Sequence, residues 1–94
     1  EESWSDKNAE VAGAIIIVYD HHKNELVENL ISIQHNYHDI IISSQHVHLD
    51  HHNCLEIIAV KGGIRKVYKL EEELKVAKGV KHAALSKSTL ARDI

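Results

Sequence analysis

The sequence predicts one α+β domain whose elements follow the order strand, helix, strand, strand, helix, strand. Three observations support this order: a β-branched run near the start, two segments with apolar residues at helical spacing, and short strand-like segments between and after them. A chain of 94 residues has room for one small domain with one core.

The first strand is expected over Val11–Tyr19. Its central β-branched run is too short for a buried helix and is typical of a strand buried on both faces. The polar stretch Asp20–Asn24 then turns the chain. An amphipathic helix is expected over Glu25–Tyr37. Its apolar residues recur three or four positions apart: Leu26, Leu30, Ile33 and Tyr37.

Two further strands are expected over Ile40–Leu49 and Cys54–Val60, joined by a hairpin loop at Asp50–Asn53. The sequence Lys61-Gly62-Gly63 interrupts the strand pattern and is expected to end the later strand.

A second helix follows, and its apolar residues form one stripe: Ile64, Val67, Leu70, Leu74 and Ala77. Gly79 stands just past the end of this stripe and is expected to act as the C-cap. The last strand is expected over Val80–Leu85, and the polar tail from Ser86 onward is expected to fray.

Two split βαβ units in this order make a ferredoxin-like sandwich, with one antiparallel sheet and both helices on one face. In that topology the first and third strands are central, and the second strand lies at an edge. The open face and the edge are then free to contact other subunits.

Charge and apolar content exclude several classes of function. The net charge is −3, so the chain offers no basic surface to a phosphate backbone. No apolar run approaches the ~20 residues of a membrane-spanning helix, and no secretory signal is expected. The single cysteine, Cys54, fits a reducing cytoplasm. There is no methionine, and the polar stretch Glu1–Glu10 is expected to be a linker, which leaves residues 11–94 as the domain proper.

Nine histidines are the unusual feature of the composition. His46 and His48 alternate with one residue in a predicted strand, so both imidazoles point to the same face. Their Cα atoms are roughly 6.5–7 Å apart, and two rings at that spacing can both reach one ion at about 2 Å. Cys54 begins the partner strand and is expected beside them, at a strand end and outside the core. Two imidazoles with a thiolate suit nickel, copper or zinc, and not calcium or magnesium.

Three ligands leave a fourth position. His51 and His52 lie in the predicted loop, where reaching back would distort the hairpin. His35 and His38 end the first helix, and either could serve, from the same chain or from a neighbour. Glu56 is either an acceptor that orients a ligand imidazole or an exposed strand charge. Taken singly, the remaining histidines are interpreted as solvated: His21, His22, His51, His52 and His82.

Four short motifs carry a resemblance to a known family. They are Gln34-His35-x-x-His38-Asp39, His46-Val47-His48, Cys54-Leu55-Glu56 and Gly79-Val80-Lys81-His82. In this order they resemble the nickel-responsive transcriptional regulators of the NikR family, and the similarity spans about Val11 to Leu85.

The resemblance implies an ACT-like form of the ferredoxin-like fold that assembles into a homotetramer. It also implies a planar Ni²⁺ site, with His46, His48 and Cys54 from one subunit and His35 from a facing one. Cu²⁺ or Zn²⁺ could bind the same donors in vitro. His21 matches a family histidine of an alternative metal arrangement.

The family carries a ribbon-helix-helix DNA-binding domain ahead of this one, and Glu1–Glu10 matches only the connecting segment. Operator DNA is therefore expected to be contacted only through a missing N-terminal domain. The expected function is nickel sensing by the regulatory domain of a nickel-dependent repressor in the cytoplasm, with no membrane contact and no enzyme activity.

Two alternatives come from other classes of protein. A small metal-dependent enzyme would need an open coordination position and a general base such as Glu56. An ACT-like module that binds a small effector would need neither Cys54 nor the histidine cluster.

Overall fold

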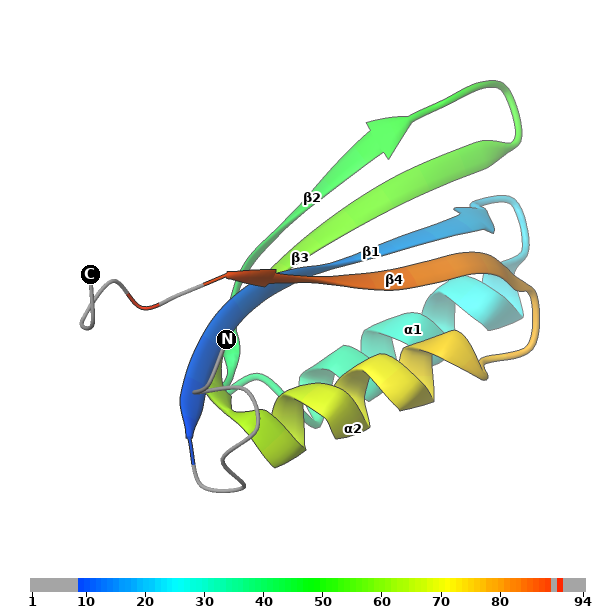
Figure 1. The fold of residues 1–94 in the computed structure, drawn as a ribbon. Helices are drawn as coiled ribbons and strands as arrows, with labels where there is room; N and C mark the ends of the chain where they lie inside the picture. The colour runs from blue at the N-terminus through cyan, green and yellow to red at the C-terminus, as the bar shows by residue number, and fades with distance from the viewer. Residues whose placement is uncertain (1–8, 89, 91–94) are drawn as a thin grey trace.

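The computed structural model describes residues 9–88 and 90. Its elements are β1 (Glu10–Asp20), α1 (Asn24–His35), β2 (Ile41–His48), β3 (Asn53–Gly63), α2 (Ile64–Lys75) and β4 (Val80–Ser88). The strands form one antiparallel sheet in the order β2-β3-β1-β4, with both helices on one face (Figure 1). The predicted ferredoxin-like sandwich is confirmed, and β2 lies at an edge as expected.

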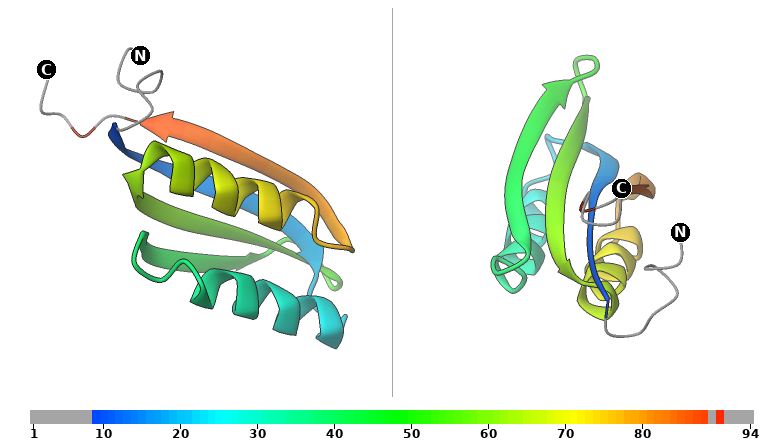
Figure 2. Two further views of the ribbon diagram at one scale, coloured as in Figure 1. Left: turned by 90° about the horizontal axis from the view of Figure 1, so that it is seen from below. Right: turned by 60° about the vertical axis from the view of Figure 1, so that its left-hand side comes forward.

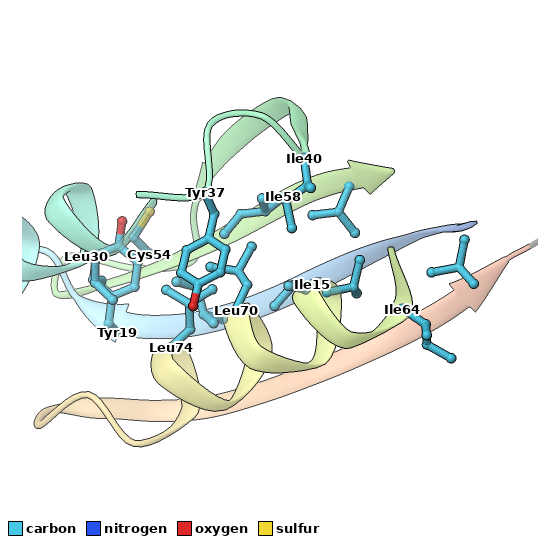
Figure 3. Packing of buried hydrophobic residues seen from close by; sticks show 14 of the residues in the cluster. Ile15, Tyr19, Leu30, Tyr37, Ile40, Cys54, Ile58, Ile64, Leu70 and Leu74 are labelled. Atoms are coloured by element: carbon cyan, nitrogen blue, oxygen red, sulfur yellow. The ribbon is translucent and has the colours of Figure 1, made fainter. Parts of the chain in front are cut away.

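The core lies between the sheet and the two helices, which run beside each other beneath it (Figure 2). Strand alternation turns every second side chain of β1 and β3 toward the helices. The buried apolar residues come from these strands, from both helices and from the turn after α1: Val11, Ile15, Ile17, Tyr19, Leu26, Leu30, Tyr37, Ile40, Cys54, Ile58, Val60, Ile64, Val67, Leu70 and Leu74. Figure 3 shows most of this cluster.

The second face of β1 differs from the prediction. Ile16 and Val18 point away from the helices and are only half-buried in the single chain. The prediction of a strand buried on both faces therefore holds on the helix side alone, because no described element covers the other face (Figure 1).

Strand β3 runs through Lys61-Gly62-Gly63, so the predicted break there was wrong. Gly62 pairs with Val11 of β1. A Cβ at Gly62 would lie 2.5 Å from Cγ2 of Ile40, so the glycine gives room for that buried side chain. Here glycine marks a close approach inside a strand and does not end it.

The ends of α1 and α2 also differ from the expected positions. Tyr37 lies just beyond α1, and its buried hydroxyl donates a hydrogen bond to Glu73 of α2. Burial, and then this bond, raise the pKa of Tyr37 to about 12. The cap of α2 is Val76, so the prediction that Gly79 caps this helix was wrong. Gly79 has φ +100° and instead makes the turn into β4, where the backbone favours a residue without a Cβ.

At both ends of the described chain, the strands extend beyond their predicted bounds. Ser86–Ser88 pair with β1, so the prediction of a frayed tail was wrong for these residues. Most of the predicted linker, residues 1–8, lies outside the described residues, but Glu10 already pairs with Gly63. Neither described helix has the length and apolar character needed to span a bilayer.

Candidate metal centre

The pairing of β2 with β3 brings two predicted ligands directly opposite each other. His48 is the partner of Cys54, and His46 is the partner of Glu56. Opposed residues of an antiparallel pair point to the same face, with Cβ atoms roughly 4.5–5.5 Å apart. Because Cys54 and Glu56 are buried on the helix side of β3, all four side chains belong to that face.

Cys54 is only 2% exposed and belongs to the core cluster, together with Tyr19 and Leu30 (Figure 3). The expectation of a cysteine outside the core was wrong, because its side chain lies on the helix side of a central strand, opposite Tyr19 of β1. Its sulfur makes a weak contact with the carbonyl of Leu55 at 3.8 Å. The core therefore holds this donor in place.

Glu56 is 3% exposed, so its interpretation as an exposed strand charge was wrong. The Tyr19 hydroxyl donates to its Oε1 and the Gln34 amide to its Oε2, each at 3.1 Å. The same Oε1 lies 3.4 Å from Nε2 of His46. Burial, followed by the nearby Glu56 and Cys54, raises the pKa of Tyr19, which keeps the phenol protonated as a donor. Glu56 is thus a buried acceptor beside a predicted ligand.

The two histidines of β2 are accessible at the sheet edge. The His46 side chain is 55% exposed. The ring of His48 stacks on the ring of His21, with centroids 4.9 Å apart and planes inclined by 3°. The structure therefore places His21, in the turn after β1, against one of the predicted ligands.

His35 is the last residue of α1 and is exposed. Its ring is near His38, with centroids 5.9 Å apart. Across residues 9–88 and 90, no group of three or more His, Cys, Asp or Glu side chains is arranged to hold a metal ion as it stands. Within the described residues of one chain, His48 and Cys54 are opposed, but neither His46 nor His35 joins them in a ligand group.

The residues at this edge nevertheless fit a transition metal by donor chemistry. Two exposed imidazoles can turn about their side-chain bonds, and a fixed sulfur stands opposite one of them. A ligand imidazole commonly has its second nitrogen on a carboxylate, which is the place of Glu56 beside His46. A nitrogen and sulfur set of this kind favours nickel, copper or zinc.

One cluster of histidines was not predicted from the sequence. The rings of His22, His51 and His52 lie together at the end of the sheet, with every pair of centroids within 5.5 Å. The two adjacent-histidine pairs of the sequence were the available signal, but treating each residue singly hid it.

Comparison with known proteins places these features in a wider group. A family model described as the NikR C-terminal nickel-binding domain matches residues 12–88. A protein of Chlorobaculum parvum, provisionally named as a nickel-responsive regulator, is 65% identical over 79 residues, which cover 84% of this chain and 59% of that protein. One from Nitratidesulfovibrio vulgaris strain DP4, with the same provisional name, is 49% identical over 94 residues, which cover all of this chain and 68% of that protein.

Among solved structures, an uncharacterized protein from Thermotoga maritima superposes with a TM-score of 0.75 at 13% identity, covering 83% of this chain and 96% of its own. The C-terminal domain of the MgtC protein from Mycobacterium tuberculosis gives 0.63 at 14% identity, covering 95% and 98%. At these identities the likeness concerns the fold alone. The chain spans about three fifths of the length of the first curated relatives it matches.

Proposed function

Since this chain belongs to the family of NikR C-terminal nickel-binding domains, we propose that it is the nickel-sensing, subunit-assembling part of a nickel-dependent transcriptional repressor. The observation that carries the proposal is the β2–β3 register, which sets His48 opposite the buried Cys54 and His46 beside the buried Glu56. The family match supports Ni²⁺ as the ion, and the register supports these residues as its donors.

In the proposed site, Cys54 supplies sulfur from the core, and His46 and His48 supply imidazole nitrogen from the edge strand. His35 of the partner subunit supplies the fourth donor. His35 is exposed at the end of α1 and forms no ligand group with the other three among the described residues of one chain, which supports donation to a neighbour. Four protein donors around the ion give a closed site for Ni²⁺, and Cu²⁺ or Zn²⁺ would compete for the same donors.

Assembly into a tetramer is supported by the face of the sheet that the helices leave open. Its central residues are apolar and half-buried in the single chain: Ala14, Ile16, Val18, Leu55, Ile57 and Ala59. A small domain with such a face gains from burying it against another subunit.

A ligand set divided between chains explains how the ion could act as a signal. An ion shifts an equilibrium between two subunit arrangements only by its difference in affinity for them. A misaligned interface loses one donor, so Ni²⁺ favours the aligned arrangement.

DNA contact would be made by parts of the protein other than this domain. The relatives are longer than this chain, and the net charge of −3 offers the phosphate backbone no electrostatic attraction. A regulator of this kind would act in the cytoplasm.

The metal-dependent enzyme is disfavoured by the site as well as by the family. A general base must be free to accept a proton from substrate or water. Glu56 already accepts hydrogen bonds from Tyr19 and Gln34, and it is buried. An effector-binding module would leave the opposed cysteine and histidine without a role.

Absorption spectroscopy tests the ligand set. Titration of Ni²⁺ into the wild-type chain should give a thiolate-to-nickel charge-transfer band together with the d–d bands of a planar ion, saturating at one ion per chain. Cys54→Ala should lose the band and the tight binding, whereas Glu72→Ala, which changes an exposed residue of α2, should keep both. Tight binding with an unchanged spectrum in Cys54→Ala would remove the cysteine from the site.

Subunit mixing tests the division of ligands between chains. His35→Ala and Cys54→Ala should each bind Ni²⁺ poorly alone. After subunit exchange, a pair with one variant of each kind has one intact site and one that lacks two donors, so tight binding should return well below full stoichiometry. No recovery, once exchange is confirmed by mass spectrometry, would mean that the site is closed within one chain.

A further inference from the structure

A pocket opens between the end of α1 and the start of α2, which lie at the same end of the molecule (Figure 2). Its volume is about 410 Å³, within the range of sites for small ligands. Two of its lining residues come from the turn after α1 and four from α2: Asn36, Tyr37, Arg65, Lys66, Lys69 and Glu73. Polar and charged side chains from two elements thus converge on one hollow in the surface.

Three of the lining residues are cations, and all three lie in the first two turns of α2. Arg65 and Lys69 are four positions apart, so their side chains share one face of the helix, and Lys66 adjoins that face. Like charges at this spacing repel each other. The helix dipole also disfavours cations in the first turn, where α2 has no acidic residue. These cations therefore do not stabilise α2, and an anion bound among them would relieve their repulsion.

The carboxylates of this region leave two of the cations without an ion pair. Asp39 pairs with Lys66 at 2.5 Å, and Glu73 accepts a hydrogen bond from the buried tyrosine of the turn after α1. Among the described residues, neither Arg65 nor Lys69 forms an ion pair. Both side chains are exposed, so they can turn toward an anion in the pocket.

The chemistry of these donors suits a phosphate group. A guanidinium donates two parallel hydrogen bonds to two phosphate oxygens, and a lysine ammonium adds a point charge. The side-chain amide of Asn36 supplies a further donor from the turn after α1. A DNA backbone suits the helix less well, because residues 71–73 are three glutamates that follow the cations along α2 and would repel a polyanion laid on it.

We propose that the pocket between α1 and α2 binds a small phosphate-bearing anion, held by Arg65, Lys69 and the amide of Asn36. Lys66 neutralises Asp39 and so limits its repulsion of the ligand. The phosphate is carried either by inorganic phosphate or by a small phosphomonoester. This site shares no residue with the proposed nickel site and does not rest on it.

The test is a titration of the metal-free, ¹⁵N-labelled chain, followed by NMR, in which sodium phosphate replaces sodium chloride at constant ionic strength. The backbone amides of Arg65 and Lys69 and the side-chain amide of Asn36 should shift together. A dissociation constant of about 1 mM is expected for a few exposed contacts. AMP replaces phosphate in a parallel titration. Tighter binding of AMP would assign the pocket to a phosphomonoester, and equal or weaker binding would assign it to inorganic phosphate.

Substitutions of opposite sign test the assignment. Arg65→Gln and Lys69→Gln should each weaken phosphate binding by roughly threefold to tenfold, since each removes one exposed charge-assisted contact. Glu73→Gln should strengthen it by about twofold, because the negative charge is lost while an oxygen remains to accept from Tyr37. Lys75→Gln is the matched control. It removes the same charge from α2 outside the pocket and should change the affinity by less than about twofold.

Three results would overturn the phosphate site. They are the absence of shifts with phosphate, shifts of equal size at all the lysines of the chain, and equal weakening in Lys69→Gln and Lys75→Gln, which would reduce the effect to net charge. Circular dichroism checks that each variant is folded. If Arg65→Gln does not fold, Arg65→Lys takes its place. That variant keeps the charge but loses the paired hydrogen bonds, so it should still bind more weakly than the wild type, and an unchanged affinity would remove Arg65 from the site.

Discussion

Replacement of Glu56 tests the buried network that joins the sheet to α1. Glu56→Ala should destabilise the metal-free domain by about 2–4 kcal/mol. The buried Tyr19 hydroxyl and the half-buried Gln34 amide would each lose an acceptor. A buried donor without a partner costs about 1–3 kcal/mol, and the half-buried amide costs less because water can reach it. Loss of a buried charge offsets part of this cost, because the carboxylate no longer has to be kept out of water.

Glu56→Gln keeps the shape of the side chain and should cost only about 1 kcal/mol. The new amide oxygen can accept from Tyr19, and the amide of Gln34 can turn so that its oxygen accepts from the new NH₂ group. The same variant should nevertheless weaken nickel binding by about tenfold, because the carboxylate beside Nε2 of His46 is gone. Stability and metal affinity should thus respond differently to this one change.

Urea unfolding followed by circular dichroism at pH 7 measures these differences. All variants are compared at one protein concentration with a metal chelator present, since assembly and bound metal both shift the midpoint. Glu72→Ala, at an exposed position of α2, is the control and should stay within about 0.5 kcal/mol of the wild type. A Glu56→Ala midpoint equal to that of the control, or equal losses for the alanine and glutamine variants, would refute the network.

Three further predictions concern the core, the sheet and the loop. Cys54→Ala should abolish tight nickel binding and also lower the metal-free stability by about 1–2 kcal/mol, because a void replaces buried sulfur; coincident urea midpoints would contradict this. Gly62→Ala should cost about 1–3 kcal/mol, since its Cβ would lie 2.5 Å from Cγ2 of Ile40. Gly63→Ala, where a Cβ meets nothing within 4 Å, is its control, and equal midpoints would refute the clash. The Asp50 carboxyl should titrate near pH 2 by NMR. Because this pKa is lowered by folding, its stabilisation is present above pH 4 and lost as the pH falls toward 2; a midpoint at 3.8 would contradict the loop geometry.

The order and type of the elements were predictable because each carries a strong local pattern. The β-branched run of β1 and the apolar stripes of both helices depend only on neighbours within a few positions. The continuation of β3 through Gly62 was not predictable from such patterns. Its glycine is required by the Ile40 side chain, which lies more than twenty positions away in the sequence.

The candidate site, too, was predictable where it depends on local patterns and not where it depends on contacts between distant residues. Alternation predicted that His46 and His48 share a face, and the hairpin predicted Cys54 opposite them. The burial of Cys54 and Glu56 was missed because alternation within a strand does not say which face the helices cover. The approach of His22 to the β2–β3 loop was missed because the contact joins residues about thirty positions apart.

The placement of the proposed donors also links one nickel site to the next. Gln34 donates to Glu56 and directly precedes His35, the residue proposed to serve a neighbouring subunit. Glu56 in turn lies beside His46, a proposed ligand of this subunit's own site. The buried Glu56 carboxylate therefore lies beside His46, a proposed ligand of this subunit's own site. It also accepts a hydrogen bond from Gln34, the neighbour in sequence of His35, which is proposed to complete the site of another subunit. On the proposed ligand set, Glu56→Gln should disturb both kinds of donor at once, whereas a change confined to His46 should leave the donation of His35 intact.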